Sequence, residues 1–190
     1  MEAFLASLST VAIAEIGDRT QLLLLMLAVR HRRPWPILAG MICGTVVSAA
    51  LAAFIGERLG HALSPRLVNL IVGISLIAMA AWELKPERAD DQEEAAARGG
   101  LFWTTLLTFT VAELGDKTQI ATAVLGAAYR NFAGVVAGST VGMVLACAPV
   151  IFIGKLLALR LPLRAIRITA SLLFLGLGVL FLVRGLLGVS

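Results

Sequence analysis

Hydrophobic residues fill six long stretches of the chain, separated by short breaks that carry charged residues, glycine or proline. A transmembrane helix needs about 20 mainly apolar residues, and each stretch approaches or exceeds that length. The stretches are residues 3–29, 35–56, 67–84, 101–128, 132–154 and 165–187. The pattern therefore predicts an all-α integral membrane protein with six transmembrane helices.

The composition excludes a soluble globular domain and a disordered chain. Hydrophobic residues make up 59% of the 190 residues and charged residues only 15%, whereas soluble domains average about 45–50% and about 25%. Two cysteines are too few for a disulfide framework, and the sequence has no Cys/His cluster typical of a soft-metal site. We interpret the net charge of +4 as basic cytoplasmic loops, not as a nucleic-acid surface.

Lysine and arginine are distributed unevenly between the two sides of the predicted membrane domain. Ten of the 16 lie in the first, third and fifth loops, and four lie on the opposite side. Cytoplasmic loops carry the excess of basic residues. This distribution predicts that both termini are non-cytoplasmic and that the polar linker 85–100 is cytoplasmic.

The two halves of the chain repeat one another at an offset of 98 residues. Residues 14–21 read AEIGDRTQ and residues 112–119 read AELGDKTQ. The predicted organisation is a first three-helix repeat over 1–84, the linker 85–100 and a second three-helix repeat over 101–190. Because each half has an odd number of helices, the halves insert with opposite orientation, a construction used by secondary transporters.

Each copy of the repeated motif places two acidic residues near the middle of a predicted span: Glu15 and Asp18 in the first, Glu113 and Asp116 in the second. In a helix, positions i and i+3 share a face, so each pair presents two carboxylates to one side. A charge near the bilayer centre costs at least about 2.5–3.5 kcal/mol. The four carboxylates therefore need compensating charges.

Two basic residues are placed to supply part of that compensation. Arg19 lies four residues after Glu15 and Lys117 four residues after Glu113, the spacing of intrahelical ion pairs. Four negative charges then face two positive ones, and one divalent cation would neutralise the remainder. The alternative is that the buried charges only hold helices together. Two symmetry-related copies favour the cation site, because inverted repeats would bring both copies together.

The motif also contains neutral oxygen donors and a glycine. Candidate neutral ligands are Thr20, Gln21, Thr118 and Gln119; their alternative role is ordinary interhelical hydrogen bonding. An all-oxygen shell selects magnesium, calcium or manganese over copper and zinc. Gly17 and Gly115 favour a local helix break near the site, with close helix packing as the alternative.

Small residues recur at every fourth position in the second and fifth stretches. The series includes Gly40, Gly44 and Gly56 in the second stretch, and Gly138 and Gly142 in the fifth. Such spacing lets helix backbones approach closely, so we predict tight helix packing along these stretches.

With its twin Glu-x-Gly-Asp-Lys/Arg-Thr motifs, the whole chain resembles the GDT family of membrane proteins. The resemblance implies two inverted halves of about three helices each and exchange of calcium or manganese ions for protons. It also implies a bacterial plasma membrane location and assigns cation binding to the motif carboxylates Glu15, Asp18, Glu113 and Asp116. Many members have Ser after the motif Thr, where this chain has Gln21 and Gln119.

The residues themselves predict how such an exchange would work. Crowded carboxylates in a low-dielectric site repel one another, so an empty site takes up protons and an arriving divalent cation displaces them. We predict export of a divalent cation from the cytoplasm, Mn²⁺ first and Ca²⁺ second, driven by proton entry. The metal is a substrate and no cofactor is expected. The expected partners are the cation, protons and the lipid bilayer, not nucleic acid.

Two other classes of function stay open. An exporter of a basic amino acid or another small cation would also need paired carboxylates, and a non-transporting scaffold would use the buried charges only for helix register. An enzyme is not predicted, because the segments contain no Ser/His, Cys/His or His-rich zinc constellation. The chain is short for a transporter, which leaves a homodimer open, although two internal halves suffice for one pathway.

Overall fold

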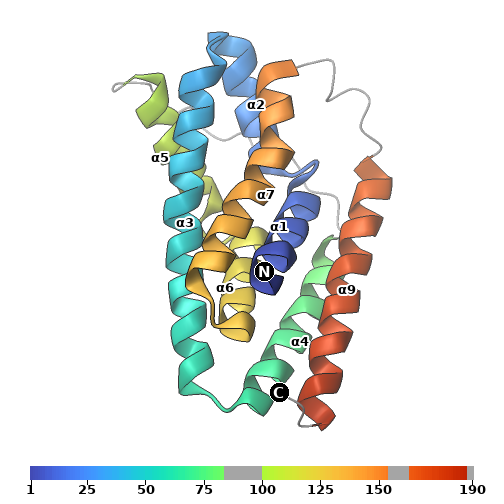
Figure 1. Cartoon of the computed structure of the whole chain (residues 1–190). Helices are drawn as coiled ribbons and strands as arrows, with labels where there is room; N and C mark the ends of the chain where they lie inside the picture. Colours follow the sequence, from blue (N-terminus) through green and yellow to red (C-terminus); the bar gives the residue numbers. More distant parts are fainter. Residues whose placement is uncertain (84–99, 154–162, 188–190) are drawn as a thin grey trace.

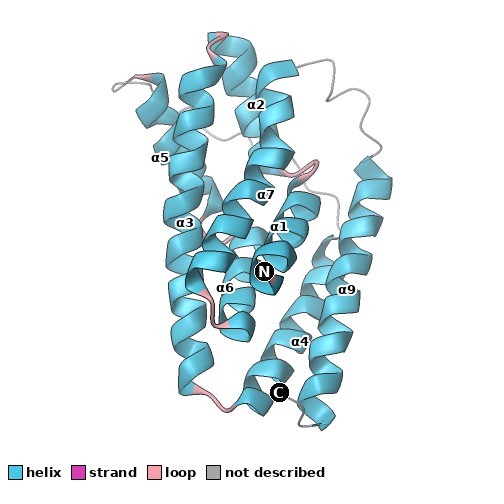
Figure 2. Ribbon diagram, in the orientation of Figure 1, coloured by secondary structure: helices cyan, strands magenta, loops and turns pink. Residues whose placement is uncertain are grey.

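The computed structural model describes residues 1–83, 100–153 and 163–187, which are almost entirely helical (Figure 2). The helices are α1 (Glu2–Glu15), α2 (Arg19–His31), α3 (Pro34–Ala62), α4 (Pro65–Glu83), α5 (Leu101–Glu113), α6 (Lys117–Tyr129), α7 (Phe132–Ile153) and α9 (Leu163–Leu187). These residues contain no strand, which confirms the all-α prediction for them. The expected linker lies outside the described residues apart from Gly100.

The first and fourth predicted spans are each built from two helices, α1 with α2 and α5 with α6. Between the two helices of each pair, Gly17 has a φ of 82° and Gly115 a φ of 81°. This left-handed backbone region is open to glycine at little cost. The break favoured at the two motif glycines is therefore confirmed, and the stretches 3–29 and 101–128 each contain two helices.

The other predicted spans are single helices with nearly the predicted bounds. α3 begins with Pro34 at its first turn, where a missing backbone N–H costs nothing. It continues to Ala62, six residues beyond the predicted end of that span. α4, α7 and α9 each start or end within about two residues of the predicted bounds, as is normal for helix ends.

Helices of the first half run opposite to their counterparts in the second half (Figure 1). By the colour sequence, α3 descends through the view while α7 ascends, and α4 ascends while α9 descends. The halves are interleaved: α1 packs on α7, α5 packs on α3, and α4 packs on α9. The two helix breaks therefore lie inside one bundle built from both halves.

Glycines on α3 and α7 make the same contacts at positions 98 residues apart. A Cβ on Gly40 would lie 2.7 Å from the carbonyl oxygen of Phe102, and a Cβ on Gly138 would clash with the carbonyl oxygen of Phe4. Phe4 and Phe102 are themselves 98 residues apart. These contacts confirm the predicted close packing. The first-half helix α3 contacts the second-half helix α5, and the second-half helix α7 contacts the first-half helix α1 in the equivalent way.

Apolar side chains cover much of the outside of the bundle, and the four acidic side chains of the motifs lie inside it. Trp35, Leu51, Phe54 and Leu107 are about half exposed or more, whereas Glu15 is fully buried. α3 and α7 are long and apolar enough to cross a membrane, while other apolar helices are shorter, partly because two spans are broken. The distribution is the reverse of that in a soluble protein.

Candidate metal-cation site

The four motif carboxylates lie at the two helix breaks, and none is more than 4% exposed. Glu15 and Glu113 are the last residues of α1 and α5. Asp18 and Asp116 are the N-cap residues of α2 and α6. Each motif therefore supplies one carboxylate from a helix end and one from a helix start, not two from one helix face as predicted.

The two aspartates are fixed by the helices that they cap. The Asp116 carboxylate accepts hydrogen bonds from the backbone N–H of Thr118 at 3.3 Å and from its hydroxyl at 3.0 Å. Asp18 accepts from the corresponding groups of Thr20 at 3.5 and 3.2 Å. The positive end of a helix dipole favours a carboxylate at this position. The break thus creates two capping sites for negative charge inside the bundle.

Three of the carboxylates converge on one point. One oxygen each from Glu15, Glu113 and Asp116 lies within 4.8 Å of the others. Oxygen ligands of Mg²⁺ or Ca²⁺ lie about 2.0–2.6 Å from the ion, so two ligands of one ion are separated by up to about twice that distance. The three side chains therefore form a candidate site for one hard cation, with ligands from both halves.

The fourth carboxylate, Asp18, pairs with a lysine from the other half. Its Oδ1 lies 2.8 Å from Lys117 Nζ, and both side chains are buried. The helical spacing on which the predicted pairs rested does not hold, because Glu15 and Arg19, like Glu113 and Lys117, belong to different helices; the Arg19 side chain lies outside the described part of the structure. Lys117 thus partly offsets the acidic charge of the opposite motif and ties the two breaks together.

The predicted neutral ligands divide into two groups. Thr20 and Thr118 contact carboxylates; the Thr20 hydroxyl also donates to Glu15. Gln21 and Gln119 instead accept hydrogen bonds, both at 2.8 Å, from the backbone N–H of Gly17 and Gly115. Their oxygens therefore satisfy backbone donors freed by the helix breaks.

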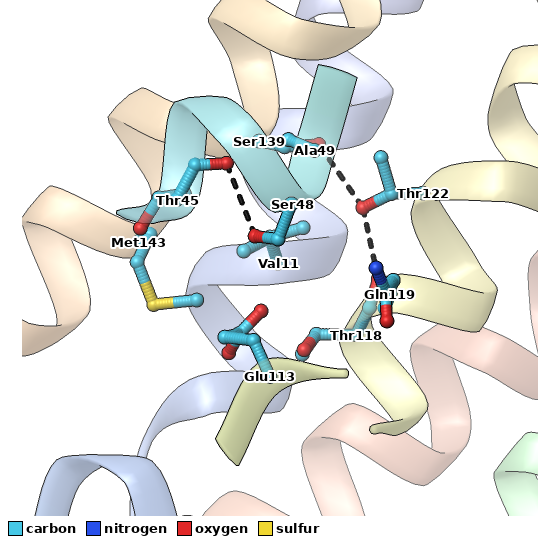
Figure 3. A pocket seen from close by; sticks show the side chains of 10 residues that line it. All are labelled: Val11, Thr45, Ser48, Ala49, Glu113, Thr118, Gln119, Thr122, Ser139 and Met143. Carbon is cyan, nitrogen blue, oxygen red and sulfur yellow. Dashed lines mark hydrogen bonds between the residues drawn. The ribbon is translucent and has the colours of Figure 1, made fainter. Parts of the chain in front are cut away.

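A small cavity beside Glu113 was not anticipated from the sequence. It measures about 10 Å³, room for roughly one water molecule. Figure 3 shows Glu113 and Thr118 on one side and the α3 residues Thr45 and Ser48 on the other. The sequence feature that could have indicated this cavity is the presence of Ser and Thr inside otherwise apolar helices.

An apolar outer surface around a buried acidic cluster is typical of one class of protein, integral membrane proteins whose intramembrane acids serve ion or proton pathways. The chain belongs to the GDT1 family of divalent cation/proton antiporters, whose sequence model matches residues 3–91 and 101–188. The family identifies the chain as an integral membrane transporter and not an enzyme. The resemblance found in the motifs is confirmed.

Relatives match nearly the whole chain. A Vibrio cholerae protein named "Putative manganese exporter" is 45% identical over 176 residues, 92% of this chain and 88% of the relative. A GDT1-like protein of Synechocystis is 30% identical, over 92% of this chain and 93% of the relative. The divalent cation/proton antiporter GDT1 of Saccharomyces cerevisiae is 27% identical, over 92% and 81%. No solved structure matches the chain.

Proposed function

We propose that this antiporter exports Mn²⁺, and secondarily Ca²⁺, from the cytoplasm in exchange for protons. The observation that carries the proposal is the convergence of Glu15, Glu113 and Asp116 from both halves within 4.8 Å. Three carboxylates around one point repel one another in a buried site unless a cation or protons lie between them. Asp18, held by Lys117, completes the acidic set.

Coupling follows from competition for the same oxygen atoms. A divalent cation needs the carboxylates deprotonated, and protons that bind to the empty site weaken cation binding. If the site opens alternately to the two sides, cation exit and proton entry use the same groups in turn. Antiport then requires no separate proton pathway.

The choice of ion rests on donor chemistry and on similarity. The candidate ligands are all oxygen, which suits magnesium, calcium and manganese. The Vibrio cholerae relative carries the name of a manganese exporter. Manganese is therefore the first substrate to test and calcium the second.

We also propose that the chain forms two inverted three-helix repeats, 1–84 and 101–190, with six membrane passes. Supporting observations are the opposite directions of α3 and α7, the glycine contacts that recur at the 98-residue offset, and the family match over two separate stretches. The basic-loop distribution favours non-cytoplasmic termini, and similarity to the Vibrio cholerae relative favours a bacterial plasma membrane.

The test is transport by purified protein in sealed liposomes that contain a pH-sensitive dye. Mn²⁺ or Ca²⁺ added outside should release protons from the lumen, and Glu113→Gln should abolish the signal. Lysine serves as the control substrate, because a basic-amino-acid exporter would respond to lysine and not to metal. Proton movement that is equal in wild type and Glu113→Gln would contradict the proposal.

A further inference from the structure

The cavity beside Glu113 is lined by five hydroxyl-bearing side chains, together with Glu113, Gln119 and the apolar Val11, Ala49 and Met143. Thr45 and Ser48 come from α3, Thr122 from α6 and Ser139 from α7, all of them 3% exposed or less. Thr118, which fixes Asp116, also reaches the cavity. The polar lining therefore continues directly from the carboxylate cluster.

The hydrogens of three of these hydroxyls are already directed at backbone carbonyls. Thr45 donates to Met41 at 2.9 Å, Ser48 to Thr45 at 3.2 Å and Thr122 to Thr118 at 2.8 Å. A hydroxyl has one hydrogen and two lone pairs. With the hydrogen engaged, each oxygen has a lone pair left, that of Thr122 after it accepts from Ser139 Oγ at 3.3 Å, which suits a cation or a water hydrogen and not an anion.

A further hydroxyl, one that does not line the cavity, has no hydrogen-bond partner among the described residues. Thr110 Oγ1 is buried and lies one helical turn before Glu113. It is 2.9 Å from where a Cβ on Gly44 would stand, next to Thr45. A buried hydroxyl without a partner is costly, and a water or an ion ligand at this point would remove the cost.

The equivalent region of the other half has the opposite chemistry. At the 98-residue offset, Ser48 corresponds to Ala146, Thr122 to Leu24 and Ser139 to Met41. These three apolar residues belong with Phe109 to one buried hydrophobic cluster, whose members Val11 and Met143 also border the cavity. Gln21 closes this side further by donating from Nε2 to the Ala146 carbonyl oxygen at 2.8 Å. The two sides of the carboxylate cluster are therefore not equivalent.

We propose that the hydroxyl-lined cavity is a transit subsite, the vestibule through which the single transported ion passes before it reaches the carboxylates, and that its apolar counterpart is a seal. Oxygens of Ser48, Thr122 and Ser139 replace part of the ion's water shell as it approaches Glu113. The cavity borders the first two turns of α6, directly after the helix break, at Thr118, Gln119 and Thr122. The inference rests on the proposed cation transport.

Transport kinetics provide the first test. The double variant Thr122→Val with Ser139→Ala should raise the KM for Mn²⁺ about tenfold at nearly unchanged kcat, because each hydroxyl oxygen contributes about as much as one neutral hydrogen bond. The matched control is Thr140→Val, since Thr140 bonds to the Val136 carbonyl and does not line the cavity. If the KM for Mn²⁺ were unchanged in the double variant, or rose equally in Thr140→Val, the proposed vestibule would be wrong.

Cysteine accessibility provides a test that does not depend on transport. In a background with Cys43→Ala and Cys147→Ala, the variants Ser139→Cys and Met41→Cys occupy equivalent positions in the two halves. A small charged thiol reagent applied to detergent-solubilised protein should modify Ser139→Cys at least about tenfold faster, a barrier difference of about 1.4 kcal/mol. Mn²⁺ should slow that reaction. Equal rates at the two positions would overturn the vestibule.

The two experiments separate failure of the subsite from failure of the proposed transport. If Ser139→Cys reacts selectively but Mn²⁺ neither protects it nor is transported by the wild type, the polar access route stands and the assigned ion is wrong. If Mn²⁺ is transported but the cysteines react equally, the ion enters elsewhere and the vestibule is wrong.

Discussion

At the residue scale, the four motif acids have different surroundings although their motifs are nearly identical. Glu15, Glu113 and Asp116 form the three-carboxylate group, while Asp18 contacts Lys117. The sequence alone identified all four acids, because charged residues inside apolar spans stand out. It could not identify the partner of Lys117, because an ion pair between two halves depends on how the halves pack.

Replacing Asp116 with asparagine should abolish cation transport while the protein stays folded and inserted in the membrane. The substituted side chain would keep an oxygen that can cap α6 but would remove one charge from the cluster. The measurement is Mn²⁺ flux in liposomes, with elution volume and thermal unfolding as checks on folding. Glu2→Gln, at an exposed acid at the start of α1, is the control and should keep full activity. Transport retained by Asp116→Asn would exclude the proposed ligand role.

Removing the charge of Lys117 should destabilise the bundle by up to about 3–5 kcal/mol, as expected when one partner of a buried ion pair is lost. Lys117→Met leaves the buried Asp18 carboxylate without this contact. Adding Asp18→Asn to Lys117→Met should recover part of the loss. Thermal unfolding of the single and double variants in detergent gives the coupling energy. Additive effects would show that the two side chains do not interact.

At the element scale, the helix breaks place the site. The sequence predicted a break from a glycine inside each motif, but the apolar pattern on both sides also fitted one long helix. The structure resolves this ambiguity through the positive φ of Gly17 and Gly115 and through the glutamines that accept from their N–H groups. Such glutamine contacts could not be predicted, because they exist only once the helix is broken.

Alanine at Gly115 should impair transport through backbone conformation alone. A left-handed backbone costs an L-residue about 1–2 kcal/mol, and a Cβ on Gly115 would meet no atom within 4 Å, so steric clash does not contribute. Gly176→Ala is the matched control, because Gly176 has open space but no positive φ. We expect reduced Mn²⁺ transport and lower thermal stability for Gly115→Ala and wild-type values for Gly176→Ala. Equal behaviour of the two variants would show that the break is not required.

At the scale of the whole molecule, the internal repeat indicated that two halves would meet at the acidic motifs, and the packing of α1 on α7 and of α5 on α3 agrees with that expectation. The hydroxyl-lined cavity did not follow from the repeat. It arises where the halves differ, at positions such as Thr122 and Leu24. A sequence repeat predicts the features that the two halves share. The structural effect of a difference between the halves depends on the packing of the surrounding helices and could not be predicted from the sequence.

The direction of a pH gradient should determine the direction of Mn²⁺ movement. In liposomes with an acidic lumen, protons leaving through the antiporter should drive Mn²⁺ inwards, and an alkaline lumen should drive it outwards. The apparent affinity for Mn²⁺ should fall as pH falls, because protons compete for the same carboxylate oxygens. Flux measured with a fluorescent Mn²⁺ indicator tests both statements. A proton ionophore collapses the pH gradient. If Mn²⁺ movement were the same with and without the ionophore, the protein would be a channel and not an antiporter.

The central claim is that carboxylates from both halves hold one cation. The most direct measurement is Mn²⁺ binding to purified protein by isothermal titration calorimetry, with wild type compared to Glu15→Gln and Glu113→Gln. The account predicts one Mn²⁺ per chain in the wild type and a comparable loss of affinity in both variants, although their substitutions lie in different halves. Two ions per chain, or a loss in only one of the two variants, would contradict it.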